Sequence, residues 1–290
     1  MQTTTFQIIT DSGCDISPEL LAEWGVWCEY LTFRFNDSEK EYLGSEMQND
    51  EFYQKMRDGL VAKTAAVNTE SFTAAFERAF AEGRDVLYIG LSSGISNTYN
   101  AGRLAALEAN EKHPDRKVIA VDSLCASAGQ GLLVYLAAKK AKEGATLEET
   151  AAYVEEMRPS IGHWFTVENL VYLKRGGRVS PTTALIGNAL QIKPVMHVDD
   201  DGKLIKMGTA HGRRKSLATL AAKYKELAKT PGEGTIFISQ ADCKEEAELL
   251  ADMICKQNGV TVELITNISP VIGAHAGPGT IALFFVSNAR

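Results

Sequence analysis

The chain has 290 residues, of which 45% are hydrophobic, so it can bury a substantial core and is not a peptide, a fibre or a disordered tail. Its 37 Asp and Glu residues outnumber 30 Lys and Arg residues, and the net charge of -7 argues against a dedicated DNA- or RNA-binding protein. This length favours two domains of middling size.

The five cysteines are odd in number and scattered, and none forms a Cys-x-x-Cys pair. We therefore expect neither a zinc finger nor a disulfide framework, but free thiols in a reducing cytosol. The N-terminal residues lack the charged and apolar regions of a signal peptide, and no window approaches the ~20 apolar residues of a membrane span. These patterns predict a soluble, cytoplasmic protein. The cysteines are Cys14, Cys28, Cys125, Cys243 and Cys255.

Short β-rich segments alternate with helical patterns in the first half of the chain. Ser17 followed by Pro18 predicts a helix start, and Gly25 predicts its end. An apolar stripe at helical spacing predicts a buried helix face at Phe72, Ala75, Phe76, Ala79 and Phe80. Other helices are expected at 49–56, 97–112, 126–143 and 147–157, and extended segments at 6–10, 25–35, 61–67, 86–91 and 118–121. This alternation predicts a parallel sheet with helices on both faces, in an N-terminal α/β domain of residues 1–158.

The pattern changes after Arg158-Pro159-Ser160, where we place the start of a C-terminal domain of residues 159–290. Two extended segments flank the turn Asp199-Asp200-Asp201-Gly202, which predicts a hairpin. Because only this hairpin is clearly antiparallel, a mixed α/β domain is expected. Ser180-Pro181 predicts a further helix start. The remaining helices are expected at 168–174, 213–229 and 244–257, and strands at 163–167, 191–198, 203–209, 235–239, 261–265 and 280–286.

Three extended segments of the first half end in small polar residues. Asp11 and Ser12 follow the first, Ser93 lies in the cluster after the segment 86–91, and Asp122 follows the segment 118–121. In open α/β sheets, ligands lie beyond the carboxyl ends of the strands, where such side chains converge. Each cluster alone is equally typical of helix caps and turns. The three together favour an edge of the sheet that faces a ligand.

The segment that follows residue 91 is the most informative of these. Gly94 lets the backbone turn, and Ser96, Asn97 and Thr98 come where the next helix exposes unpaired N–H groups, which attract a carboxylate or phosphate. A nucleophilic Ser96 is the competing interpretation, although the second glycine of a G-x-S-x-G elbow is missing. No P-loop or G-x-G-x-x-G motif occurs, so the sequence offers no recognised nucleotide site.

Near the C-terminus, three glycines and a proline surround His275. We expect a shaped loop without a helix between Ile272 and Thr280, in which His275 is either a structural residue or part of a site. His113 precedes a proline on an expected surface turn and is given no role. The remaining histidines are too dispersed to predict a metal site, and they are His163, His197 and His211.

Lys174, Arg175 and Arg178 surround the glycine pair Gly176-Gly177. Cations commonly occupy the C-terminal turn of a helix, where they interact favourably with its dipole. The alternative is a docking surface or an anion clamp.

Taken together, these motifs resemble the DegV family of bacterial fatty-acid-binding proteins. The resemblance rests on four segments in the family's order, at residues 10–12, 92–99, 172–180 and 272–280. It implies a two-domain α/β fold with a long-chain fatty acid buried between the domains. It also implies that Thr64, Ser96 and His275 hold the carboxylate of the fatty acid. The supporting polar edge would consist of Asp11, Ser12, Ser93, Asn97, Thr98 and Gly277.

The family includes the acyl-carrying subunit of a two-component fatty acid kinase, which implies a separate ATP-binding subunit as partner. Arg175 and Arg178 would then serve docking or phosphate steering. Because the chain lacks the ATP-binding parts of phosphoryl-transfer enzymes, we expect a carrier without catalytic residues, cofactor or metal. The alternatives are a serine hydrolase of lipids or esters, with Ser96 as nucleophile and His275 as base, and a small-molecule sensor or sugar-phosphate binder.

The sequence departs from the family pattern at two places. Ala65-Ala66-Val67-Asn68 stands where the family usually has Ser-Gln-Pro-Ser, and Asn97 stands where it has glycine. Both places are expected to touch the head-group wall. They therefore predict a different head-group or chain preference.

Overall fold

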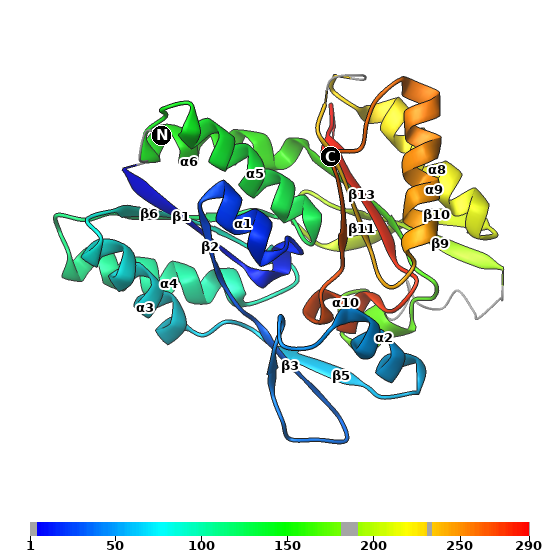
Figure 1. Ribbon diagram of the computed structural model, residues 1–290, viewed down its shortest axis with the longest axis horizontal. Coiled ribbons are helices and arrows are strands. Elements are labelled where there is room, and N and C mark those ends of the chain that lie inside the picture. Colours follow the sequence, from blue (N-terminus) through cyan, green and yellow to red (C-terminus); the bar gives the residue numbers. More distant parts are fainter. Residues whose placement is uncertain (1–4, 181–190, 231–233, 290) are drawn as a thin grey trace.

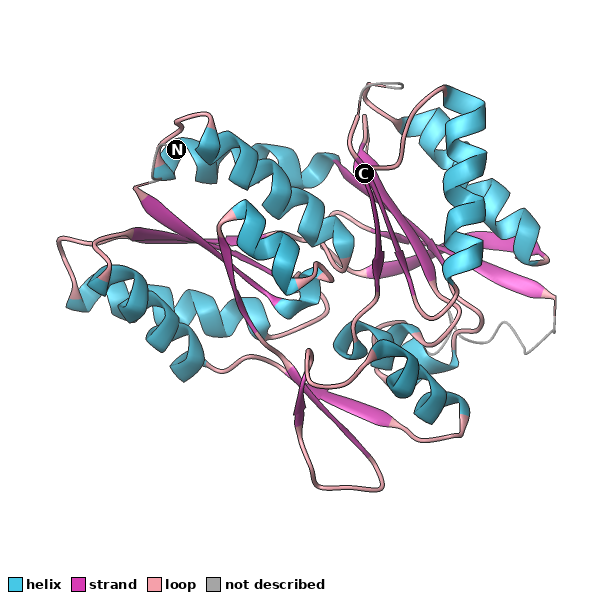
Figure 2. Cartoon of the chain, in the orientation of Figure 1, coloured by secondary structure: helices cyan, strands magenta, loops and turns pink. Residues whose placement is uncertain are grey.

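The computed structural model of the chain describes residues 5–180, 191–230 and 234–289 (Figure 1). Two sheets stand side by side, and a small third sheet lies below them in the view of Figure 2. The helix predicted to start at Ser180-Pro181 falls outside the described residues.

The first sheet is parallel, as predicted. Its strand order is β2 (Val26–Glu29), β1 (Phe6–Asp11), β6 (Asp85–Gly90) and β7 (Val118–Asp122). One face packs against α1 (Pro18–Trp24), α5 (Ala128–Lys142) and α6 (Leu147–Met157), and the other against α3 (Thr69–Ala81) and α4 (Thr98–Lys112). The predicted cover of helices on both faces is therefore confirmed.

Local signals in the sequence explain how several of these helices begin and end. The Ser17 hydroxyl accepts a hydrogen bond from the backbone N–H of Leu20, and Gly25 ends α1 with a φ of 78°. Thr146 and Glu149 form a capping box at the start of α6. The predicted apolar stripe of α3 is buried in the core.

The second sheet has six strands and is covered by helices on both faces. Its strand order is β10 (Leu204–His211), β9 (Ile192–Val198), β8 (Ile161–Thr166), β13 (Ile281–Val286), β11 (Ile236–Gln240) and β12 (Leu264–Asn267). The helices α8 (Arg213–Leu227) and α9 (Lys244–Asn258) share a core with one face of this sheet. On the other face, α5 packs against strands β8, β11 and β13, so it lies between the two large sheets.

The expected mixed α/β architecture and the hairpin of β9 and β10 are confirmed, and antiparallel pairing extends beyond that hairpin. The last strand, β13, inserts between β8 and β11 and is antiparallel to both, and β8 is antiparallel to β9. Only the β11–β12 pair of this sheet is parallel among the described strands. Hydrophobic periodicity identifies a strand but not its partner, so these further pairings could not be predicted from the sequence.

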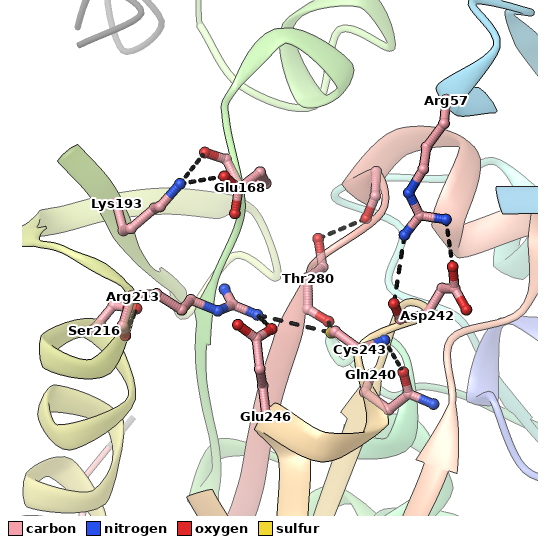
Figure 3. A network of polar contacts seen from close by, with 11 residues as sticks. Arg57, Glu168, Lys193, Arg213, Ser216, Gln240, Asp242, Cys243, Glu246 and Thr280 are labelled. Carbon is pink, nitrogen blue, oxygen red and sulfur yellow. Dashed lines mark hydrogen bonds and ion pairs between the residues drawn. The ribbon is translucent and has the colours of Figure 1, made fainter. Parts of the chain in front are cut away.

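The third sheet was not expected as a separate unit. The extended segment 25–35 breaks after β2, and its second part joins another sheet. That sheet has the order β4 (Tyr42–Leu43), β3 (Thr32–Phe35) and β5 (Ala62–Ala65), and α2 (Asn49–Arg57) packs beside it. Arg57 on α2 forms an ion pair with Asp242 after β11, which attaches this unit to the second sheet (Figure 3).

The prediction that no helix forms around His275 is wrong. The helix α10 (Pro270–Ala276) contains His275, with Pro270 in its first turn and Gly277 as its C-cap at a φ of 83°. The Tyr53 side chain packs against the helix at Gly273, where a Cβ atom would lie 2.3 Å from the Tyr53 hydroxyl. Glycine at this position therefore leaves room for Tyr53. The glycines therefore end the helix and admit a neighbour, and they do not prevent the helix.

The predicted domain boundary falls at a short 3-10 turn, η2 (Arg158–Ser160), between α6 and β8. Strands before it form the parallel and the small sheet, and strands after it form the six-stranded sheet. A division at residue 158 stays a prediction. All five cysteines are free thiols. None of the helices in the described part of the chain combines the length and the apolar composition needed to cross a bilayer.

A buried carboxyl group connects the N-terminal half to the C-terminal half. Asp15 follows the short turn η1 (Ser12–Cys14), and it accepts hydrogen bonds from the Ser127 hydroxyl at 2.5 Å and the Ser269 backbone N–H at 2.9 Å. The Ser127 hydroxyl also lies 2.9 Å from that of Ser239. Burial raises the pKa of Asp15 to about 7, against the opposing effect of these hydrogen bonds.

We expect Asp15 to make the fold less stable as the pH rises from about 4 to about 7. The pKa of its carboxyl group is about 7 in the folded protein and 3.8 ordinarily, so the folded state holds this proton more tightly. The contribution of this protonated carboxyl group to the free energy of unfolding is of the order of 4 kcal/mol. It is complete at pH values below the pKa of Asp15 in the unfolded chain, and it is lost as the pH rises through the pKa of Asp15 in the folded protein. Urea unfolding of Asp15→Asn should lack this decline. An equally steep decline in the variant would contradict the assignment.

Candidate functional site

An apolar cavity lies where the three sheets and α10 meet. Its volume is about 90 Å³, which is below the roughly 300–1,000 Å³ typical of pockets that hold drug-sized ligands. Each part of the fold contributes large apolar side chains to the walls. They include Leu31, Leu91, Phe165, Leu204, Ile272 and Phe284.

Four polar side chains that line the cavity come from distant parts of the sequence. Thr64 lies on β5, Ser96 in the loop between β6 and α4, Arg178 after α7 (Val171–Arg175), and His275 on α10. The Nε2 atom of His275 is 2.8 Å from the Thr64 hydroxyl. The Ser96 hydroxyl lies 2.9 Å from that of Thr98 and accepts a hydrogen bond from the Thr98 backbone N–H. The cavity therefore combines long apolar walls with a small set of hydrogen-bonding groups.

The electrostatics of this set suit an anionic ligand. Burial, and secondarily the nearby Arg178 cation, lowers the pKa of His275 to about 4, so the imidazole is neutral at pH 7. Burial also lowers the pKa of Arg178, but a guanidinium keeps its proton in proteins. Arg178 thus brings a positive charge to the cavity, and no Lys, Asp or Glu is among the described residues that line it.

Arg178 also lies at the boundary between the cavity and an open groove. Its Nε atom donates to the carbonyl of Ile95 at 3.0 Å, and its Nη1 atom donates to the carbonyl of Gly176. Ile95, Arg178 and Leu204 line both the cavity and the groove. The groove is further lined by Lys174, Lys203 and Lys206, with Asp199 as an acidic neighbour. Arg175 is exposed against the ring of Tyr172 and lines neither space.

The residues expected to support the head group lie outside the cavity wall. Asp11 is fully buried and accepts hydrogen bonds from the backbone N–H groups of Gly13 and Leu91 and the hydroxyl of Tyr88. The Ser12 hydroxyl accepts from the N–H of Leu31. These two side chains join the ends of β1 and β6 to their surroundings, so they shape the edge that carries Ser96.

The other four supporting residues differ in environment. Thr98 is buried and contacts Ser96, whereas Ser93 and Asn97 are exposed. Ser93 donates its backbone N–H to Asp122, so the ends of β6 and β7 do converge, as expected of a parallel sheet. Gly277 ends α10, and the Tyr172 ring occupies the place of a Cβ there.

The two departures from the family pattern do not reach the cavity. Ala65 and Ala66 are exposed, and neither they nor Asn97 line it. Asn68 caps α3 by accepting a hydrogen bond from the N–H of Ser71. The expectation that these substitutions touch the head-group wall is therefore wrong.

The polar residues of the cavity wall that sequence reasoning missed include Ser127 and His163. Ser127 has a φ of 54°, which is rare for a residue with a side chain. The Nδ1 atom of His163 lies 2.8 Å from the carbonyl of Ile161. Nothing in their local sequence marks them, because their position depends on how α5 packs between the sheets.

Comparison with known proteins gives a consistent result. Residues 5–288 match the family model described as "Uncharacterised protein, DegV family". A DegV domain-containing protein of Clostridium perfringens is 41% identical over 288 residues, which are 98% of each chain. The structure of a fatty-acid-binding DegV family protein from Thermus thermophilus is similar, with a TM-score of 0.87 and 28% identity over 98% of this chain and 99% of that one. A stearic-acid-binding protein from Eubacterium ventriosum has a TM-score of 0.87 and 26% identity, with coverage of 97% and 98%.

Proposed function

Because this chain belongs to the DegV family, we propose that it is a carrier that binds a long-chain fatty acid in the cavity and presents its carboxylate to a separate fatty acid kinase. The observation that supports binding most directly is an apolar cavity lined by a hydroxyl–imidazole pair, a second hydroxyl and a guanidinium. Similar structures include fatty-acid-binding and stearic-acid-binding proteins.

The energetics favour such a ligand. Burying about fourteen methylene groups contributes roughly 11 kcal/mol of gross driving force at ~0.8 kcal/mol each. Hydrogen bonds to a charged carboxylate add ~1.5–3 kcal/mol each, and the costs of ordering the ligand subtract from this total. The tail thus supplies most of the affinity. Thr64, Ser96 and His275 determine where the carboxylate lies.

Presentation to a kinase is supported by the position of Arg178. The cavity and the basic groove share this residue, so a partner bound over the groove would approach the polar side of the cavity. Phosphorylation would join a carboxylate oxygen to the γ-phosphate of ATP and release ADP from the partner. Arg175, exposed on the same turn, is available for docking.

Mass spectrometry of the denatured protein tests the binding proposal. We expect one long-chain fatty acid per chain, and stoichiometric rebinding after delipidation. A preparation without lipid that also ignores added fatty acid would refute it. Presentation is tested separately by adding a fatty acid kinase ATP-binding subunit with ATP and trapping acyl phosphate with hydroxylamine. We expect the hydroxamate product only when the loaded carrier is present.

The geometry gives the hydrolase alternative no support. Ser96 is hydrogen-bonded to Thr98 and His275 to Thr64, and no hydrogen bond joins Ser96 to His275 within the described chain. A catalytic base needs to lie within hydrogen-bond reach of its nucleophile. A fluorophosphonate probe should therefore leave Ser96 unlabelled.

A further inference from the structure

The imidazole of His275 packs directly against Gly176. A Cβ atom at residue 176 would lie 2.2 Å from the Nδ1 atom of His275 and 3.1 Å from its Cε1 atom. Because Gly176 has a φ of -75°, which any residue adopts, its backbone conformation does not require glycine. Glycine is required here by the close approach of the ring.

The two ring nitrogens of His275 have different surroundings. Nε2 is 2.8 Å from the Thr64 hydroxyl, whereas Nδ1 is buried without a hydrogen-bond partner. The carbonyl of Gly176 accepts a hydrogen bond from Arg178. A neutral imidazole carries one N–H group. Buried N–H groups without a partner are rarer than unsatisfied acceptors.

We infer that Gly176 positions His275 as the tautomer protonated at Nε2, which makes Thr64 a hydrogen-bond donor toward the ligand. In this tautomer, Nε2–H donates to the Thr64 oxygen, and the Thr64 hydroxyl proton is free to point into the cavity. In the tautomer protonated at Nδ1, Nε2 would accept the Thr64 hydroxyl proton. Thr64 would then offer only oxygen lone pairs to a carboxylate, which would repel them. This step rests on the proposed function, because it assumes an anionic head group at Thr64.

The tautomer is measured without any ligand. In protein labelled with ¹⁵N-histidine at pH 7, long-range ¹H–¹⁵N correlation spectra should show His275 protonated at Nε2, with its signals assigned by their loss in His275→Ala. Protonation at Nδ1, or at both nitrogens, would overturn the inference. This outcome does not depend on whether the protein binds a fatty acid.

A double-mutant cycle tests whether Gly176 acts through His275. Gly176→Ala and His275→Ala should each weaken fatty acid binding about tenfold or more, the size expected for one hydrogen bond to a charged group. The double variant should bind no worse than His275→Ala, because removal of the ring leaves space for the new Cβ. If the fold-losses in affinity of the two single variants multiply in the double variant, the inference is overturned.

A matched control separates this effect from a general cost of the substitution. Gly208→Ala on β10 places a Cβ in open space, so it should leave affinity and melting temperature unchanged. Gly176→Ala should retain the native circular dichroism spectrum and shift the ¹⁵N signals of His275. If the wild-type protein shows the expected tautomer but no fatty acid binding, the proposed function fails and the tautomer assignment stands.

Discussion

The double substitution Ser96→Ala/His275→Ala is expected to weaken fatty acid binding by roughly 10²–10⁴-fold. It removes the Ser96 hydroxyl and the imidazole that orients the Thr64 hydroxyl, and each of these two hydroxyl hydrogen bonds to the charged carboxylate contributes ~1.5–3 kcal/mol. Both side chains line the cavity. Alanine also suits the helical position of His275. We therefore expect the fold to persist while the affinity falls, as measured by titration of the delipidated protein and by thermal unfolding.

The matched control replaces the same residue types away from the cavity. Ser45 and His211 are both exposed, and neither lines the cavity. Ser45→Ala/His211→Ala should therefore bind as the wild-type protein does. An unchanged affinity in Ser96→Ala/His275→Ala would remove the head-group assignment, even if fatty acid binding itself is confirmed.

Filling the cavity is expected to abolish binding of long acyl chains. Ala282 and Phe284 lie on the same side of β13, because alternate residues of a strand share a face, and both line the cavity. In the series Ala282→Val, Ala282→Leu and Ala282→Phe, each larger side chain takes more of the space that the ligand would occupy. We expect the affinity to fall stepwise along the series and to be lost at phenylalanine.

Thermal unfolding of the delipidated variants provides the control for this series. A side chain that enters an existing cavity buries apolar surface without displacing neighbours, so stability should be maintained at the smaller substitutions. A loss of stability at valine, together with unchanged ligand affinity, would mean that residue 282 faces packed side chains.

Local features of the fold, such as helix ends, could be predicted from the sequence, whereas the pairing of distant strands could not. Helix ends with a direct chemical signal, such as Ser17 and the Thr146–Glu149 capping box, were predicted correctly. The pairing of β13 was not, because it depends on contacts between segments far apart in the chain. The helix around His275 was missed because its glycines suggest a loop when the packing of Tyr53 and Tyr172 is unknown.

The candidate site shows the same division. Thr64 and His275 are 211 residues apart in sequence, and residue patterns alone could not have paired them; family resemblance named both. The resemblance did not indicate that Ser127 and His163 line the cavity. Their positions follow from tertiary packing of α5 against both large sheets, which leaves no local trace in the sequence.

The central claim is that the cavity holds an acyl chain with its carboxylate at Thr64, Ser96 and His275. A crystal structure of the delipidated protein soaked with a long-chain fatty acid tests this claim most directly. The account predicts one continuous tube of electron density between the sheets, ending in a carboxylate within hydrogen-bond distance of the Thr64 and Ser96 hydroxyl groups. An interior filled with side chains, or a fatty acid bound only on the outer surface, would contradict it.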